Sequence, residues 1–105
     1  MRTIFQRAAA MAAVFAFLTG AASAATVEVK IKNFKFSPAD ITVAKGDTIV
    51  WDNQDIATHT ATARDKSFDI TIKAGQKGSV VVKDAGTFDY FCRFHPMMKG
   101  QVVVK

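Results

Sequence analysis

Apolar and polar residues alternate along most of the chain after residue 25. Val27, Val29 and Ile31 are separated by charged residues, which is the period-two pattern of a strand with one buried face. No stretch beyond residue 25 has the period of an amphipathic helix. Further short apolar runs, bounded by turn-forming residues, occur at residues 41–43, 48–51, 68–72, 79–82, 88–92 and 101–105. The pattern predicts an all-β Greek-key sandwich of about seven to eight short strands.

Two interruptions matter for the prediction. The first alternating run continues through Phe34 and Phe36 until Ser37-Pro38 ends it, because proline lacks the N–H group that a strand needs. The pattern is also lost over residues 54–66, a segment that includes His59. We expect this segment to be a loop.

The N-terminal segment has the organisation of a secretory signal peptide. Arg2 and Arg7 precede an apolar run of 11 residues, Ala8 to Leu18, and small residues follow at 21–25. A membrane-spanning helix needs about 20 apolar residues, so the run is too short to be an anchor. We expect cleavage after Ala24 or Ala25. The signal peptide is then residues 1–24 and the mature domain is residues 25–105, exported to the periplasm with no membrane span.

Net charge and cysteine content narrow the range of possible functions. The 105-residue chain has a net charge of +5, and loss of the two arginines of the signal peptide leaves +3, carried by dispersed residues. Nucleic-acid binding, which needs clustered lysine and arginine, is not expected. The single cysteine, Cys92, cannot form a disulfide within the chain. Small exported domains usually need a disulfide or a metal for stability. Cys92 is therefore a candidate metal ligand, and the alternatives are an intermolecular disulfide, a nucleophile or a small buried residue.

The candidate metal ligands lie in one short segment near the C-terminus. Cys92, His95 and a methionine at 97 or 98 place a thiol, an imidazole and a thioether within seven residues. Thiolate and thioether ligands favour copper(I), and imidazole suits both copper states. Two histidines, one cysteine and a weak axial methionine make a blue-copper site, and His59 is the only other histidine.

Other interpretations of these residues are weaker. Structural zinc needs four strong nitrogen or sulfur ligands, and calcium needs a denser carboxylate cluster than Asp52 and Asp55 provide. A nucleophilic Cys92 with His95 as its base would leave His59 and the methionines unexplained. Each residue alone has an ordinary structural explanation, such as a buried cysteine or a solvated histidine, but their joint occurrence favours copper.

At these residues the sequence resembles the cupredoxins, the small blue-copper proteins, and within them the amicyanin group. The resemblance covers the mature chain. It is carried by Phe36-Ser37-Pro38, Gly46-Asp47-Thr48, Trp51-Asp52-Asn53, Gly86-Thr87-Phe88-Asp89-Tyr90 and the short Cys92-x-x-His95-x-x-Met98 loop. Thr60 stands where the family often has an asparagine that ties the two ligand loops together.

The resemblance implies one type 1 copper ion per chain, with Met98 rather than Met97 as its axial ligand. The ligand set is then His59, Cys92, His95 and Met98. We expect an electron carrier, not an enzyme, that meets redox donor and acceptor proteins transiently and is a monomer. An apolar shell is expected from Tyr90, Phe91, Phe94, Pro96 and Met97. The alternatives are a periplasmic copper carrier or storage protein that uses the same ligands, and a metal-free interaction domain.

Overall fold

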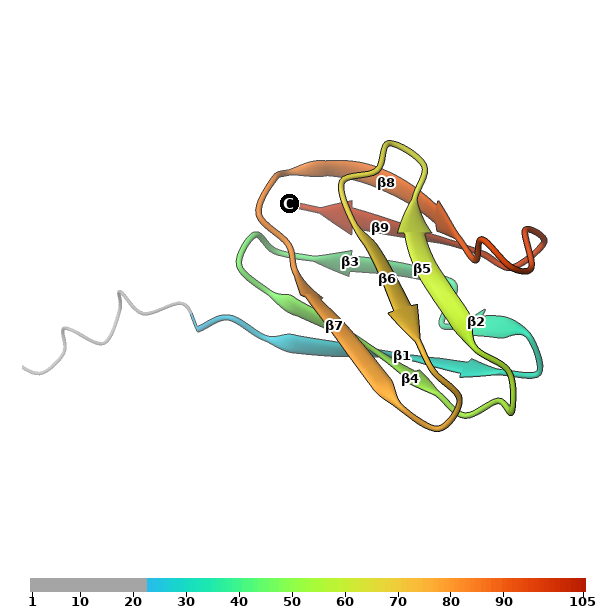
Figure 1. The fold of residues 1–105 in the computed structure, drawn as a ribbon. Coiled ribbons are helices and arrows are strands. Elements are labelled where there is room, and N and C mark those ends of the chain that lie inside the picture. The colour runs from blue at the N-terminus through green and yellow to red at the C-terminus, as the bar shows by residue number, and fades with distance from the viewer. Residues whose placement is uncertain (1–22) are drawn as a thin grey trace, which may run out of the picture.

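The computed structural model describes residues 23–105 and has nine β-strands in that range (Figure 1). The strands are β1 (Thr26–Lys32), β2 (Lys35–Ser37), β3 (Asp40–Val43), β4 (Thr48–Asn53), β5 (His59–Ala63), β6 (Asp69–Ile72), β7 (Lys77–Val81), β8 (Gly86–Phe91) and β9 (Lys99–Val104).

These strands form two sheets that pack face to face (Figure 1). One sheet has the order β2-β1-β4-β7, and the other has the order β3-β9-β8-β5-β6. Strands β1 and β4 are parallel, as are β3 and β9. The prediction of an all-β sandwich is confirmed. No helix within residues 23–105 has the length and apolarity needed to cross a membrane. The predicted signal peptide lies almost wholly outside the described residues.

The first alternating run is two strands rather than one. The chain reverses at Asn33 and Phe34, so that Ile31 pairs with Phe36 across an antiparallel hairpin. Both turn residues have positive φ, 53° for Asn33 and 59° for Phe34, as a type I′ hairpin turn requires. Asparagine adopts this conformation readily, whereas a bulky residue such as Phe34 rarely does. The turn therefore needs support from outside the hairpin.

The expected loop over residues 54–66 contains the strand β5, which the hydrophobic pattern missed. All five residues of β5 are buried, with β6 on one side and β8 on the other. Its sequence is His-Thr-Ala-Thr-Ala, so neither face carries the large apolar side chains that mark a strand. Ala61 faces the core, while Thr60 and Thr62 make side-chain hydrogen bonds on the opposite face.

Aromatic packing fills the centre of the sandwich. Trp51 and Tyr90 are almost completely buried, and the Trp51 Nε1–H donates a hydrogen bond of 3.2 Å to the Tyr90 hydroxyl. Burial raises the pKa of Tyr90 to about 12, despite the opposing effect of this bond. The Tyr90 ring also lies directly over Gly100 of the neighbouring strand. A side chain at position 100 would displace that ring.

We expect Gly100→Ala to destabilise the protein for this reason. An added Cβ would clash with Cζ of Tyr90, and overpacking of this kind costs about 1–3 kcal/mol. Urea unfolding measures the effect, with Thr87→Ala, an exposed change on β8, as the control. The control should stay within about 0.5 kcal/mol of wild type. Equal midpoints for Gly100→Ala and the control would contradict the packing described here.

Candidate metal centre

Three connections meet at one end of the sandwich, on the right in Figure 1. They are the β1–β2 turn, the β4–β5 loop and the β8–β9 loop. The β8–β9 loop carries Cys92, His95 and Met98, and His59 is the first residue of β5. Residues far apart in the sequence are thus brought to one place by the ends of their strands.

The β8–β9 loop is closed by hydrogen bonds among its own candidate ligands. The His95 N–H donates to the Cys92 carbonyl at 3.2 Å, and the Met98 N–H donates to the His95 carbonyl at 2.8 Å. The Cys92 N–H donates in turn to the Met98 carbonyl at 3.2 Å. The three candidate ligands are spaced three residues apart, and each interval is one hydrogen-bonded turn of the backbone. Side chains at the three positions cannot move far from one another while these bonds hold.

The structure separates the two methionines that the spacing left equivalent. Met98 is 4% exposed and belongs to the same core cluster as Cys92. Met97 is 89% exposed. Only Met98 therefore lies where an inward ligand is needed.

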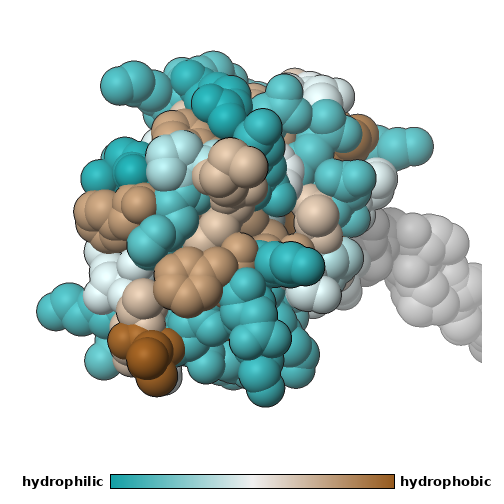
Figure 2. All heavy atoms as spheres, turned by 90° about the vertical axis from the view of Figure 1, so that its right-hand side faces the viewer, coloured by the Kyte–Doolittle hydropathy of each residue, from teal (hydrophilic) through white to brown (hydrophobic). Residues whose placement is uncertain are grey.

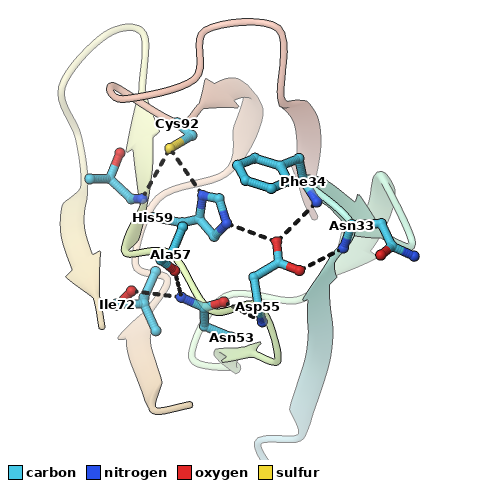
Figure 3. A network of polar contacts seen from close by, with 9 residues as sticks. Asn33, Phe34, Asn53, Asp55, Ala57, His59, Ile72 and Cys92 are labelled. Atoms are coloured by element: carbon cyan, nitrogen blue, oxygen red, sulfur yellow. Dashed lines mark hydrogen bonds and ion pairs between the residues drawn. The ribbon is translucent and has the colours of Figure 1, made fainter. Parts of the chain in front are cut away.

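Cys92 and His59 face each other across a short buried gap. The Cys92 Sγ lies 3.7 Å from His59 Nδ1, and both residues are fully buried (Figure 3). The backbone N–H of Thr60 also donates a hydrogen bond to the sulfur, at 3.3 Å. A thiolate at this position would keep one fixed hydrogen-bond donor, and its remaining lone pairs would be free for a metal.

Asp55 orients the ring of His59. His59 Nε2 lies 2.9 Å from the Asp55 carboxylate, whose side chain is only 9% exposed (Figure 3). A carboxylate only accepts hydrogen bonds, so in the neutral ring Nε2 carries the proton and Nδ1 presents its lone pair toward Cys92. Metal-binding histidines are commonly held by a carboxylate in this way. This role of Asp55 was not predicted from the sequence.

The same carboxylate supports the strained β1–β2 turn. Its Oδ1 accepts the Asn33 N–H at 2.7 Å, and its Oδ2 accepts the Phe34 N–H at 2.9 Å (Figure 3). Burial alone would raise the pKa of Asp55, but hydrogen bonds from Phe34, His59 and Asn33 together hold it below its ordinary value. Asp55 is therefore ionised at neutral pH and ties this turn to His59.

Phe34 covers the two histidines. Its ring meets the ring of His59 edge-on at 5.1 Å and that of His95 at 4.8 Å, and the two imidazoles are 5.1 Å apart. Phe34 was not among the residues expected to form the apolar shell. Tyr90 was, but its ring packs against Phe36, Trp51 and Phe68 in the core. Because Phe34 comes from a hairpin distant in sequence, only the folded chain reveals its place.

Two further side chains shape the loops. Asn53 is fully buried, and its amide donates to the carbonyls of Ala57 and Ile72, while its oxygen accepts the Asp55 N–H (Figure 3). These bonds fix the course of the β4–β5 loop. The Thr60 hydroxyl accepts the Arg93 N–H at 2.8 Å, which ties the His59 and Cys92 segments together. Thr60, where the resemblance led us to expect an asparagine, thus connects the two segments through its hydroxyl.

The donor set decides which metal fits. In the part of the chain that the structure describes, no three His, Cys, Asp or Glu side chains form a metal cluster of their own. The possible donors at this end are the Cys92 thiol, the His59 and His95 imidazoles and the Met98 thioether. Hard cations prefer oxygen ligands, and structural zinc prefers four strong nitrogen or sulfur donors. Thiol, imidazole and thioether together suit copper.

The surface over this end is apolar at its centre. Figure 2 looks onto this end and shows apolar residues in the middle of the face, with hydrophilic residues around them. The exposed apolar side chains of the three connections are Phe34, Ile56, Phe94 and Met97. The Arg93 guanidinium lies over the Phe94 ring, 5.5 Å from its centroid.

Fold and site together define a small two-sheet β-sandwich with candidate metal ligands gathered at one end. The profile of the family described as Cupredoxin-like domain matches residues 7–104. The chain belongs to the cupredoxin family.

Named relatives agree with this assignment. The chain is 32% identical to amicyanin-alpha of Methylorubrum extorquens over 107 residues, covering 96% of this chain and 90% of that protein. It is 28% identical to amicyanin of Paracoccus versutus over 85 residues, covering 75% of this chain and 64% of that protein, just under two thirds.

Solved structures give the same result. The crystal structure of Paracoccus versutus amicyanin superimposes with a TM-score of 0.68 at 28% identity, covering 76% of this chain and 81% of that one. A Cu(I) form of an amicyanin variant superimposes with a TM-score of 0.68 at 29% identity, covering 76% and 82% of the two chains. Among cupredoxins, the chain is similar to the amicyanins.

We expect Asp55→Ala to destabilise the metal-free protein by about 1–2 kcal/mol, because the N–H groups of Asn33 and Phe34 lose their acceptor. Urea unfolding at neutral pH measures the change. Asp84→Ala removes an exposed carboxylate from another turn and should be nearly neutral. If both variants unfolded at the wild-type midpoint, Asp55 would not be supporting the turn.

Proposed function

We propose that this chain is a periplasmic type 1 (blue) copper protein that carries single electrons between redox proteins. The proposed ligands are His59, Cys92, His95 and Met98. The observation that carries the proposal is the pairing of Cys92 and His59. A buried thiol lies 3.7 Å from an imidazole nitrogen whose ring is fixed by a carboxylate on its other side.

The residues around the site would perform distinct tasks. Copper, when bound, would supply a one-electron couple between Cu(II) and Cu(I). Cys92 would bind as the thiolate, so its proton would be released on metal binding. Asp55 would keep His59 Nδ1 free of a proton, and the bonded β8–β9 loop would hold Cys92, His95 and Met98 in one arrangement. Strand ends that scarcely move reduce the rearrangement that accompanies each electron transfer.

Redox partners would dock on the apolar face in Figure 2. His95 lies beneath Phe34 at this face and is half-buried, so it offers a short route for an electron. Interfaces of transient electron-transfer complexes are small, and charge mainly steers the encounter. We propose that the chain works as a monomer with alternating donor and acceptor proteins, rather than as an enzyme. The similarity to amicyanins supports this proposal.

A copper titration tests the function. We expect purified mature protein to develop an intense blue absorption that saturates at one Cu(II) per chain and is bleached by reductant. Cys92→Ala should show no such band, because the charge-transfer transition needs the thiolate. Weak absorption that is the same in both proteins would contradict the proposal. Rapid loss of copper to a chelator without reversible redox cycling would instead support the copper carrier.

We also propose that the signal peptide is removed after Ala24. The Ala25 N–H donates to Asp47 at 2.8 Å, and the Ala25 carbonyl accepts the Thr48 N–H at 2.9 Å. Hydrogen bonds from Ala25 and Ala44 hold the pKa of Asp47 below its ordinary value, so its carboxylate is charged. Cleavage after Ala24 would place a new ammonium group on that carboxylate, a charge-assisted bond. Cleavage after Ala25 would remove both contacts.

The intact mass of protein recovered from the periplasm checks this proposal. We expect a chain that begins at Ala25. A chain that begins at Thr26 would contradict the role given to the contact with Asp47. The full-length chain purified from the cytoplasm provides the reference mass.

A further inference from the structure

A chain of hydroxyl groups runs from the β8–β9 loop to β6. The Arg93 N–H donates to Thr60 Oγ1 at 2.8 Å, Thr60 Oγ1 lies 2.9 Å from Thr62 Oγ1, and the Thr62 hydroxyl donates to Asp69 Oδ1 at 2.7 Å. The Asp69 carboxylate only accepts, so Thr62 must use its single proton there. Thr60 must therefore donate to Thr62. All three bonds point in one direction and end on a negative charge.

The chain of bonds closes on the residue where it starts. The Arg93 Nε–H donates to the same Asp69 oxygen at 3.2 Å. Arg93 directly follows Cys92. Its backbone N–H is thus bound to Thr60, at one end of the series of hydrogen bonds, and its side chain is bound to Asp69, at the other end. The two threonines are buried, whereas Asp69 and Arg93 are partly exposed. The loop cannot shift at Arg93 without breaking bonds at both ends.

We propose that Thr62 and Asp69 are positioning residues for Cys92, acting through Thr60 and Arg93. Neither residue touches the sulfur. Thr60 does so through its N–H group, and its hydroxyl holds the backbone immediately after Cys92. The effect on the copper site rests on the function proposed above; the effect on the loop does not.

Hydrogen bonds in series strengthen one another in a low dielectric, and a terminal carboxylate makes each hydroxyl a better acceptor. The hydrogen bond from Thr62 is the main reason that the pKa of Asp69 lies below its ordinary value. The ion pair between Asp69 and Arg93 is exposed and adds little to stability. Its more specific effect is to hold the position of Arg93.

The positioning role is tested in the metal-free protein by amide hydrogen exchange, measured residue by residue with NMR. Thr62→Val keeps the shape of the side chain but removes the hydroxyl. We expect the Arg93 amide to exchange about tenfold faster than in wild type, which corresponds to about 1.4 kcal/mol. Thr71→Val is the matched control, because Thr71 is exposed on β6 and pairs with Thr60. Equal Arg93 exchange in the two variants would overturn the proposal.

Asp69→Ala provides a second route if Thr62→Val fails to fold. Asp69 is partly exposed and lies outside the core, so its removal leaves the core intact while the series of hydrogen bonds loses its final acceptor. We expect faster exchange at Arg93 here too, with little change at amides of β1 and β4. Unchanged exchange at Arg93 would overturn the proposal by this route as well.

The copper-loaded protein supplies the second readout. Hydrogen bonds to the cysteine sulfur tune the reduction potential of such sites, and they favour the reduced state, in which the sulfur carries more negative charge. We expect Thr62→Val to lower the Cu(I)/Cu(II) ratio at a fixed ambient potential about threefold, or about 30 mV for a one-electron couple. If Thr62→Val left the reduction potential of copper unchanged while Arg93 exchanged faster, the proposed effect of Thr62 on the metal site would be overturned. If wild type itself bound no copper, the proposed function would fail while the exchange result still decided the positioning role.

Discussion

The Asp55 carboxylate receives hydrogen bonds from two separate parts of the chain. The geometry of the end of the sandwich that holds the candidate ligands depends on both. One part is the β1–β2 turn, where Phe34 has a backbone conformation that a phenylalanine rarely adopts. The other is His59, whose ring is directed at Cys92 by the same carboxylate. Because one group serves both, the covering ring of Phe34 and the candidate ligand beneath it are positioned together. The buried amide of Asn53 holds Asp55 in place.

A second constraint fixes the position of Cys92. The Cys92 segment is held from β5 through Thr60, and β5 is itself enclosed by β6 and β8. Two different groups therefore support the site: a carboxylate on the β4–β5 loop holds His59, and Thr60, the next residue of β5, holds the Cys92 segment. Such double support would suit the proposed copper centre, which would have to keep the same shape in two oxidation states.

Much of this architecture follows from the sequence, and the failures have identifiable causes. Alternation located β1 and β8, and a short apolar run located β4. The Cys92, His95 and Met98 spacing pointed to the end where the loops meet. Strand β5 escaped detection because a buried strand of alanine and threonine has no large apolar face to alternate. The roles of Phe34 and Asp55 were not predictable, because both depend on contacts between segments about 20 residues apart. A sequence pattern describes neighbours along the chain, and these contacts arise only when the strand ends converge.

Both described ends of the chain lie away from the loops that hold the candidate ligands (Figure 1). Strand β1 starts, and β9 stops, at the opposite end of the sandwich, where Ala25 contacts Asp47 and Lys105 contacts Val43. A fusion partner, an affinity tag or an attachment to an electrode can therefore be joined at Lys105 without obstructing the apolar face. Attached in this way, the domain would present His95 outward to whatever approaches from solution.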